Sequence, residues 1–226
     1  RIITPQYREV NERKYILRDV IRLQDIPVRI DNQTLEISVK SAFLPNSKVQ
    51  VYFLDYKPFF FRKGLYVDES KGGEAYADND KRYILLCKGV LETLKKLQWQ
   101  PDVIHCNDWQ TGLVPLMIKA RGEKDSFFKK ISTLMSVHNF AFQGNFDSRF
   151  LSTLECDAYT SEFDKFKVNG HYSFLKAGLV FADQVNTVSK NHAKETKTSD
   201  EFGFGFSKLL KSRGNDYTGI VNGIDD

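Results

Sequence analysis

The feature that most restricts the fold of this sequence is a regular alternation of two apolar patterns from Val103 onward. Short apolar runs typical of buried strands occupy 103–106, 131–137, 184–189 and 218–221. Between them, helices are predicted over 112–121, over the nearly apolar segment 173–181 and from Lys190 onward. A flexible aromatic loop is expected at 202–206, before a turn at Lys208–Lys211. Strands that alternate with helices are typical of βαβ units, in which the strands pair in parallel. We therefore predict an α/β fold built on a doubly wound, mostly parallel sheet.

The sequence that precedes these segments has a different pattern. Ile2-Ile3 is predicted to be a strand, and residues 26–56 alternate apolar and polar side chains around two turns. This alternation predicts an antiparallel hairpin region at one edge of the main sheet. Apolar residues spaced by three and four predict a helix over 80–97. All of these segments are assigned to a single domain over residues 1–226.

Composition excludes several classes of function. The 226 residues are 41% hydrophobic with a net charge of +4, an excess that fits a small anionic ligand but is too weak to indicate nucleic-acid binding. Cys87, Cys106 and Cys156 lie far apart, so we expect neither a zinc site nor disulfides, and a reducing compartment. No apolar run approaches the length of a membrane span, so no membrane partner is expected.

Polar residues lie at the ends of four of the predicted strands. They are Asn107-Asp108, His138-Asn139, Ser189 and Asn222. The carboxyl ends of parallel strands project from the same edge of a sheet, so we expect a ligand-binding crevice there. Asp108 either orients a ligand hydroxyl or caps a helix that begins near Trp109. His138 either hydrogen-bonds a ligand or makes structural hydrogen bonds at its strand end.

The loop after His138 is apolar and then closes with Gln143-Gly144-Asn145, which is typical of the edge of a site. Trp109 and Phe142 either stack on a sugar or belong to the core. Asn222-Gly223 either faces the crevice or forms a turn.

Three common nucleotide and hydrolase motifs are missing from the sequence. No G-x-G-x-x-G follows a strand, no G-x-x-x-x-G-K-[ST] is present, and no G-x-S-x-G elbow occurs. Lys71-Gly72-Gly73 lacks the preceding strand and the following helix that a phosphate-binding loop requires. A polar, partly aromatic crevice suited to hydroxyl-rich ligands remains as the hypothesis.

Several blocks of the sequence resemble the bacterial glycogen synthase and plant starch synthase family. The strongest are PDVIHCNDWQTGL at 101–113, SVHNFAFQG at 136–144, SFLKAGLVFAD at 173–183 and GIVNGID at 219–225. Two shorter blocks agree, YADNDKRY at 76–83 and EFGFG at 201–205. They occur in the family's order and span nearly the whole chain.

The resemblance implies the N-terminal half of a two-Rossmann-domain (GT-B) glycosyltransferase, and hence a Rossmann-like sheet. The implied reaction is the transfer of glucose from ADP-glucose or UDP-glucose to the non-reducing end of an α-1,4-glucan, with retention. The implied partners are this nucleotide-sugar donor and this glucan acceptor, with no metal and no cofactor. The implied location is the cytoplasm, or the plastid in a plant.

The resemblance also implies roles for individual residues. His138 matches the family's active-site histidine that faces the transferred glucose, and Asp108 matches an aspartate that lines the same cleft. Tyr76, Asp78 and Asn79 match a loop near the acceptor. The residues that we assign to substrate binding are Tyr76, Asp78, Asn79, Asn107, Trp109, Asn139, Gln143 and Asn222.

The sequence departs from the family pattern in four ways. Asn107 stands where the family usually has His, and Phe142 where it often has Tyr. The family's Lys-x-Gly-Gly loop precedes the strand at Ile2, and its second domain, which carries most of the donor site, follows Asp225. We therefore expect a missing C-terminal domain to pack on this one, and the chain alone to be inactive. The alternatives are another GT-B enzyme with a different donor or acceptor, and a non-catalytic carbohydrate-binding domain.

Overall fold

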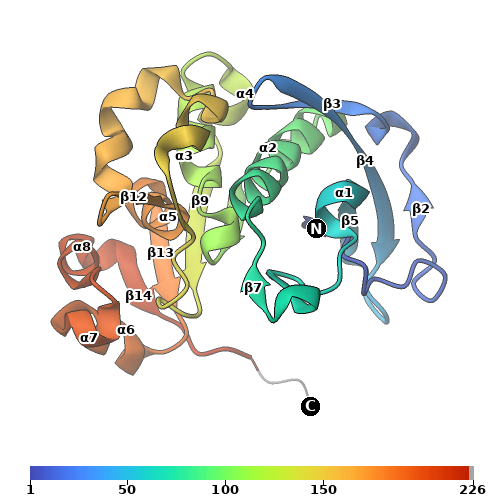
Figure 1. The fold of residues 1–226 in the computed structure, drawn as a ribbon. Coiled ribbons are helices and arrows are strands. Elements are labelled where there is room, and N and C mark those ends of the chain that lie inside the picture. Colours follow the sequence, from blue (N-terminus) through green and yellow to red (C-terminus); the bar gives the residue numbers. More distant parts are fainter. Residues whose placement is uncertain (224–226) are drawn as a thin grey trace. The chain divides into compact units, whose positions relative to one another are not determined.

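A computed structural model describes residues 1–223, apart from the side chain of Ser70. The chain forms two compact units, one over Arg1–Trp99 and one that begins at Gln100 (Figure 1). Each unit has its own sheet and its own core. Whether these two units form the single domain expected over residues 1–226 is not tested by this division, so that assignment stays a prediction. The end of the family block at 219–225 lies outside the described residues.

The first unit is built on a five-stranded sheet in the order β1-β5-β4-β2, with β3 paired to β4. Its strands are β1 (Ile2–Pro5), β2 (Arg18–Asp19), β3 (Ile26–Ile30), β4 (Gln33–Phe43) and β5 (Gln50–Asp55), followed by a small hairpin of β6 (Val67–Asp68) and β7 (Glu74–Ala75). Its helices are α1 (Lys57–Phe60) and α2 (Asn79–Leu97), with 3-10 turns at Ile21–Leu23 and Glu69–Lys71.

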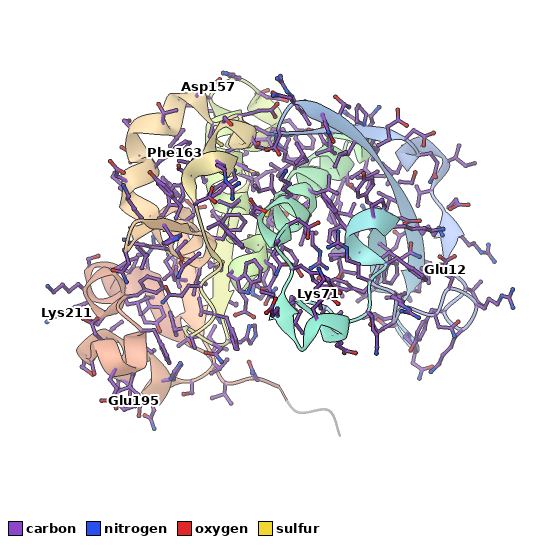
Figure 2. All side chains as sticks on the ribbon, in the orientation of Figure 1. Glu12, Lys71, Asp157, Phe163, Glu195 and Lys211 are labelled. Atoms are coloured by element: carbon purple, nitrogen blue, oxygen red, sulfur yellow. The ribbon has the colours of Figure 1, made fainter. Side chains whose placement is uncertain are left out.

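The predicted hairpin region and helix of this unit are confirmed, but the hairpin region belongs to a sheet of its own and not to an edge of the parallel sheet. β3 and β4 pair antiparallel, with Ile26 opposite Ile37, and β4 and β5 pair antiparallel in turn. β1 pairs parallel with β5. Alternation along β3 places Ile26, Val28 and Ile30 inside, and they meet the apolar face of α2. Side chains fill the space between this helix and the strands it covers (Figure 2).

The second unit contains the predicted parallel sheet, in the order β14-β13-β9-β8. Its strands are β8 (Val103–Asn107), β9 (Ser132–Val137), β13 (Gln184–Thr187) and β14 (Tyr217–Gly219), and β10 (Asn145–Phe146), β11 (Lys167–Val168) and β12 (His171–Ser173) form a separate small sheet. Its helices are α3 (Val114–Gly122), α4 (Ser126–Lys129), α5 (Phe174–Phe181), α6 (Lys190–Thr198), α7 (Asp200–Gly203) and α8 (Ser207–Ser212). The 3-10 segments are η3 (Trp109–Thr111), η4 (Ser148–Leu154), η5 (Asp157–Phe166) and η6 (Gly214–Asp216).

The core of the second unit lies where buried side chains of neighbouring strands stand side by side. Cys106 is in register with Met135, and Met135 with Val185, and each of these three is at most 2% exposed. Gly178 lets α5 lie directly on this row, since a Cβ there would come within 2.9 Å of the Met135 sulfur. The α/β fold with a parallel sheet and an added antiparallel region is confirmed.

Three expectations for the end of the chain are wrong in detail. The flexible loop expected at 202–206 contains the end of α7, and the turn expected at Lys208–Lys211 is helix α8. Asp200 holds the segment together, because its carboxylate accepts hydrogen bonds from the backbone N–H and the hydroxyl of Ser207. Helices α6, α7 and α8 lie together beside β14 (Figure 1). The last strand is also shorter than expected and ends at Gly219.

Within residues 1–223, no helix combines the length and the apolar character that crossing a membrane requires.

Candidate functional site

Asp108 and His138 meet at the carboxyl edge of the parallel sheet. Asp108 directly follows β8 and His138 directly follows β9, so parallel pairing brings the two strand ends together. One Asp108 carboxylate oxygen accepts the His138 backbone N–H at 2.7 Å, and the other lies 2.9 Å from His138 Nδ1. The two side chains are 32% and 43% exposed, so the pair stands at an open rim and not in a dry interior.

The backbone of Asp108 is strained. Its φ of 55° and ψ of −175° fall in a region that is almost exclusive to glycine. Such a conformation costs about 1–3 kcal/mol and persists only where the surroundings over-determine it. Here the Asp108 backbone N–H donates to the Ser136 carbonyl, and the carboxylate is held by His138. The strain is the type found at functional sites.

The structure tests one of the two roles considered for Asp108, that of a helix cap. Asp108 occupies the N-cap position of the 3-10 segment η3, but its side chain makes no capping hydrogen bond. The carboxylate is directed to His138 instead, so the capping alternative is wrong. With Nδ1 facing a carboxylate, a neutral His138 carries its proton on Nδ1 and presents Nε2 as an acceptor; a protonated one presents Nε2–H as a donor.

A row of polar side chains crosses the sheet just before the strand ends, and the sequence interpretation missed it. His105 on β8 hydrogen-bonds the Ser136 hydroxyl on β9, which donates to the Asn186 side chain on β13. Burial lowers the pKa of His105, and the nearby charge of His138 lowers it further. His105 is therefore neutral at physiological pH. The available signal was that each of three neighbouring strands has a polar residue, His105, Ser136 or Asn186, close to its carboxyl end.

Other predicted site residues of this unit take several positions. Asn107 is exposed as the last residue of β8, and Asn139 is exposed and accepts the Ala141 backbone N–H at 2.9 Å. Trp109 is only 8% exposed and packs against Phe146 and Phe174, which favours its core alternative.

Two further residues considered for the crevice, Phe142 and Asn222, are exposed. Phe142 is 65% exposed and therefore lies outside the core. Asn222 is exposed beyond the end of β14.

Gln143 connects the loop after His138 with the segment between α7 and α8. Its side-chain amide donates to the Phe204 carbonyl at 2.9 Å and to the Phe140 carbonyl at 3.4 Å. Its own carbonyl accepts the Ser173 hydroxyl at 3.0 Å. Gly144 follows with φ 58°, and a Cβ there would come within 2.4 Å of the Trp109 ring. Gln143 therefore orders the rim of the site by bonding two loops together.

We expect Gln143→Leu to destabilise the chain by about 1 kcal/mol, because a side chain of similar size no longer supplies the two hydrogen bonds. Amide hydrogen exchange should become faster around Phe204, and a melting curve should show the loss of stability. Gln33→Leu, at an exposed position of β4, serves as the control and should leave exchange at Phe204 unchanged. Unaltered exchange at Phe204 in Gln143→Leu would refute the connecting role.

Tyr76, Asp78 and Asn79 lie in the first unit, where their polar groups bind other parts of that unit. Both Asp78 carboxylate oxygens accept hydrogen bonds from Arg62 at 2.7 Å. Burial acts to raise the pKa of Asp78, but the bonds from Arg62 outweigh it and hold that pKa below its usual range. Asn79 is 5% exposed and donates to the Tyr66 carbonyl at 2.9 Å.

Arg82 is the centre of this arrangement, and the sequence interpretation did not single it out. It is fully buried and donates to the carbonyls of Phe59 and Leu65 and to the side-chain oxygen of Asn79, at 2.6–2.9 Å. The Tyr76 ring lies 4.9 Å from the guanidinium carbons of both Arg82 and Arg62. Both contacts are within the range of cation–π attraction.

Among the described residues, no three His, Cys, Asp or Glu side chains gather in a way that could hold a metal ion.

The parallel sheet and the Asp108–His138 pair at its carboxyl edge define the class of protein to which the second unit belongs. This is a Rossmann-like α/β unit with an open polar site at the edge where such sheets bind ligands. The chain belongs to a particular family within that class. Residues 1–212 match the family model of the starch synthase catalytic domain.

Curated relatives agree with the family. The chain is 41% identical over 229 aligned residues to glycogen synthase of Chlorobaculum tepidum, which covers all of this chain and 46% of that protein. It is 38% identical to glycogen synthase of Moorella thermoacetica, again over all of this chain and 43% of that protein. The chain therefore spans somewhat less than half the length of these relatives.

A solved structure shows the same fold. The catalytic domain of starch synthase IV from Arabidopsis thaliana, bound to ADP and acarbose, matches with a TM-score of 0.83 at 23% sequence identity. The match covers 99% of this chain and 44% of that chain. The expected N-terminal part of a GT-B fold is confirmed.

Proposed function

We propose that this chain is the acceptor-side half of a glucan-elongating glycosyltransferase. The reaction is the transfer of glucose from ADP-glucose, or UDP-glucose, to the non-reducing end of an α-1,4-glucan with retention. One observation carries the proposal: the Asp108–His138 pair stands open at the carboxyl edge of a parallel sheet, in a chain of the starch synthase family. The relatives are glycogen synthases.

The geometry suits a positively charged, oxocarbenium-like transition state. His138 contacts the glucose unit through Nε2, because Nδ1 is bound to Asp108. Asp108 holds the ring in one orientation and adds a negative charge next to it. Preorganised groups of this kind stabilise developing charge without rearranging during the reaction. Asp108 therefore acts through His138, whereas His138 acts on the sugar.

The remaining half of the relatives' length supplies the rest of the site in this proposal. The chain alone is then inactive in transfer and requires a C-terminal domain that packs against it. The proposed location is the cytoplasm, or the plastid if the source is a plant.

Titration of the chain with maltooligosaccharide, followed by NMR, tests the acceptor role. We expect weak binding with shifts at Asp108 and His138, and at Tyr76 if the loop assigned to the acceptor contributes. A β-1,4-linked glucan oligomer of equal length serves as the matched control and should cause no comparable shifts. A flat titration, or equal responses to both oligomers, would contradict the acceptor role.

A further inference from the structure

A polar hollow lies at the edge of the same parallel sheet opposite to the Asp108–His138 pair. Its volume is about 420 Å³, which is within the range of pockets that hold small molecules. It is lined by Ser132, the first residue of β9, whereas His138 follows the last residue of that strand. Six residues of strand separate the two places by roughly 20 Å. The hollow is therefore distinct from the site assigned to transfer.

Asp183 lines this hollow and binds two other lining residues, Thr133 and Lys119. Its carboxylate accepts the backbone N–H of Thr133 at 2.7 Å, the Thr133 hydroxyl at 2.9 Å and Lys119 Nζ at 2.9 Å. Burial acts to raise the pKa of Asp183, but these bonds outweigh it and keep that pKa below its usual range. Phe128 and Ile131 are buried beneath the hollow. The negative charge of Asp183 is thus already neutralised from within the protein.

Two positive charges at the hollow are not neutralised. Lys129 and Lys130 both line it and are exposed, and within residues 1–223 neither has an ion-pair partner. Lys119 differs, since its ammonium group is bound to Asp183. Two ammonium groups without ion-pair partners in the lining of one hollow favour a ligand with a doubly charged anionic group.

The lining of the hollow also carries groups that a bare anion does not satisfy. Glu123 and Tyr159 line it, and the Tyr159 hydroxyl lies 3.5 Å from a Glu123 carboxylate oxygen. Burial and the charge of Glu123 raise the pKa of Tyr159, so that the phenol stays neutral. A carboxylate repels an anion but accepts hydrogen bonds from hydroxyl groups. The lining therefore selects for a ligand with an anionic end and a hydroxyl-bearing end.

We infer that this hollow binds a sugar phosphate. The phosphoryl group lies at Lys129 and Lys130, and the sugar hydroxyls lie at Glu123 and Tyr159. A neutral sugar makes no use of the two free ammonium groups. Inorganic phosphate has no sugar hydroxyls that could donate hydrogen bonds to Glu123, and its negative charge is repelled by the Glu123 carboxylate. This inference does not depend on the proposed transfer activity, because no residue of the Asp108–His138 pair lines the hollow.

Titration of the 226-residue chain with glucose 6-phosphate, glucose and inorganic phosphate in separate arms tests the inference. We expect glucose 6-phosphate to bind, with NMR shifts at Glu123 and over 129–133. Inorganic phosphate should bind about tenfold more weakly, and glucose should not bind measurably. Equal affinity for glucose and glucose 6-phosphate, equal affinity for inorganic phosphate, or no binding at all would each overturn the inference.

Charge-reversal variants separate this site from general attraction of anions. Lys129→Glu with Lys130→Glu should weaken glucose 6-phosphate binding by at least about tenfold. Lys208→Glu with Lys211→Glu makes the same charge change on α8, where Lys211 is labelled in Figure 2, and should leave affinity within about twofold. An equal loss of affinity for glucose 6-phosphate in both double variants would overturn the inference.

A milder variant decides the question if the first charge reversal does not fold. Glu123→Gln removes the repulsion of an anion but keeps a hydrogen-bonding group of the same size. It should strengthen the binding of inorganic phosphate. The difference in affinity between glucose 6-phosphate and inorganic phosphate should therefore become smaller. An unchanged ratio of the two affinities would contradict the assigned orientation.

Discussion

Replacing His138 with alanine, in a full-length protein that contains this chain, is expected to lower kcat by roughly 10²–10³-fold. Removal of one preorganised contact to a transition state typically costs that much. The fold should be unaffected, because the His138 side chain is 43% exposed. The measurement is the steady-state rate of glucose transfer at saturating donor and acceptor.

His171→Ala is the matched control for this experiment. His171 is exposed on β12 and its ring lies 3.3 Å from the Asn169 carbonyl, away from the Asp108–His138 pair. Its replacement should change kcat by less than about twofold. Unchanged turnover in His138→Ala would remove the catalytic assignment and favour a carbohydrate-binding domain.

Replacing Arg82 with methionine is expected to destabilise the first unit by about 3–5 kcal/mol. Arg82 is fully buried, and three oxygen acceptors lose a hydrogen bond from a charged donor. Each buried acceptor left unsatisfied costs about 1–3 kcal/mol. Methionine fills part of the volume but can donate to none of them. Chemical denaturation of the chain gives the change in the free energy of unfolding.

Arg149→Met is the control for Arg82→Met. Arg149 is 88% exposed, and its bonds to Asp147 lie on the surface, so its removal should change stability by less than about 0.5 kcal/mol. A loss of unfolding free energy below about 1 kcal/mol in Arg82→Met would show that solvent satisfies the Phe59 and Leu65 carbonyls. Arg82 would then not be needed to hold residues 59–65 in place.

Local patterns in the sequence predicted the secondary elements well where apolar spacing was regular. The helix at 80–97 and the strand at 131–137 agree with α2 and β9 to within a residue. The pattern failed at 202–206, where two glycines between phenylalanines indicated a loop. There the stabilising interactions are made by Asp200 and Ser207, whose pairing depends on side-chain chemistry rather than on apolar periodicity.

The candidate site was predicted in part. Parallel pairing was enough to bring Asp108 and His138 to one edge, because strand ends are set by topology. The strained backbone of Asp108 and the bonds of Arg82 were not predictable, since both depend on contacts between segments far apart in the sequence. The resemblance placed Tyr76 and Asn79 near an acceptor, but their observed bonds hold the first unit together.

Glucose transfer by the full-length protein tests the central proposal most directly. The protein is incubated with maltooligosaccharide and either ADP-glucose or UDP-glucose labelled in the sugar, and the product is digested with an amylase that releases α-linked units from the non-reducing end. We predict that label enters the oligosaccharide from at least one donor and that the amylase releases it. Absence of transfer from both donors, or label that resists the amylase, would contradict the proposed function.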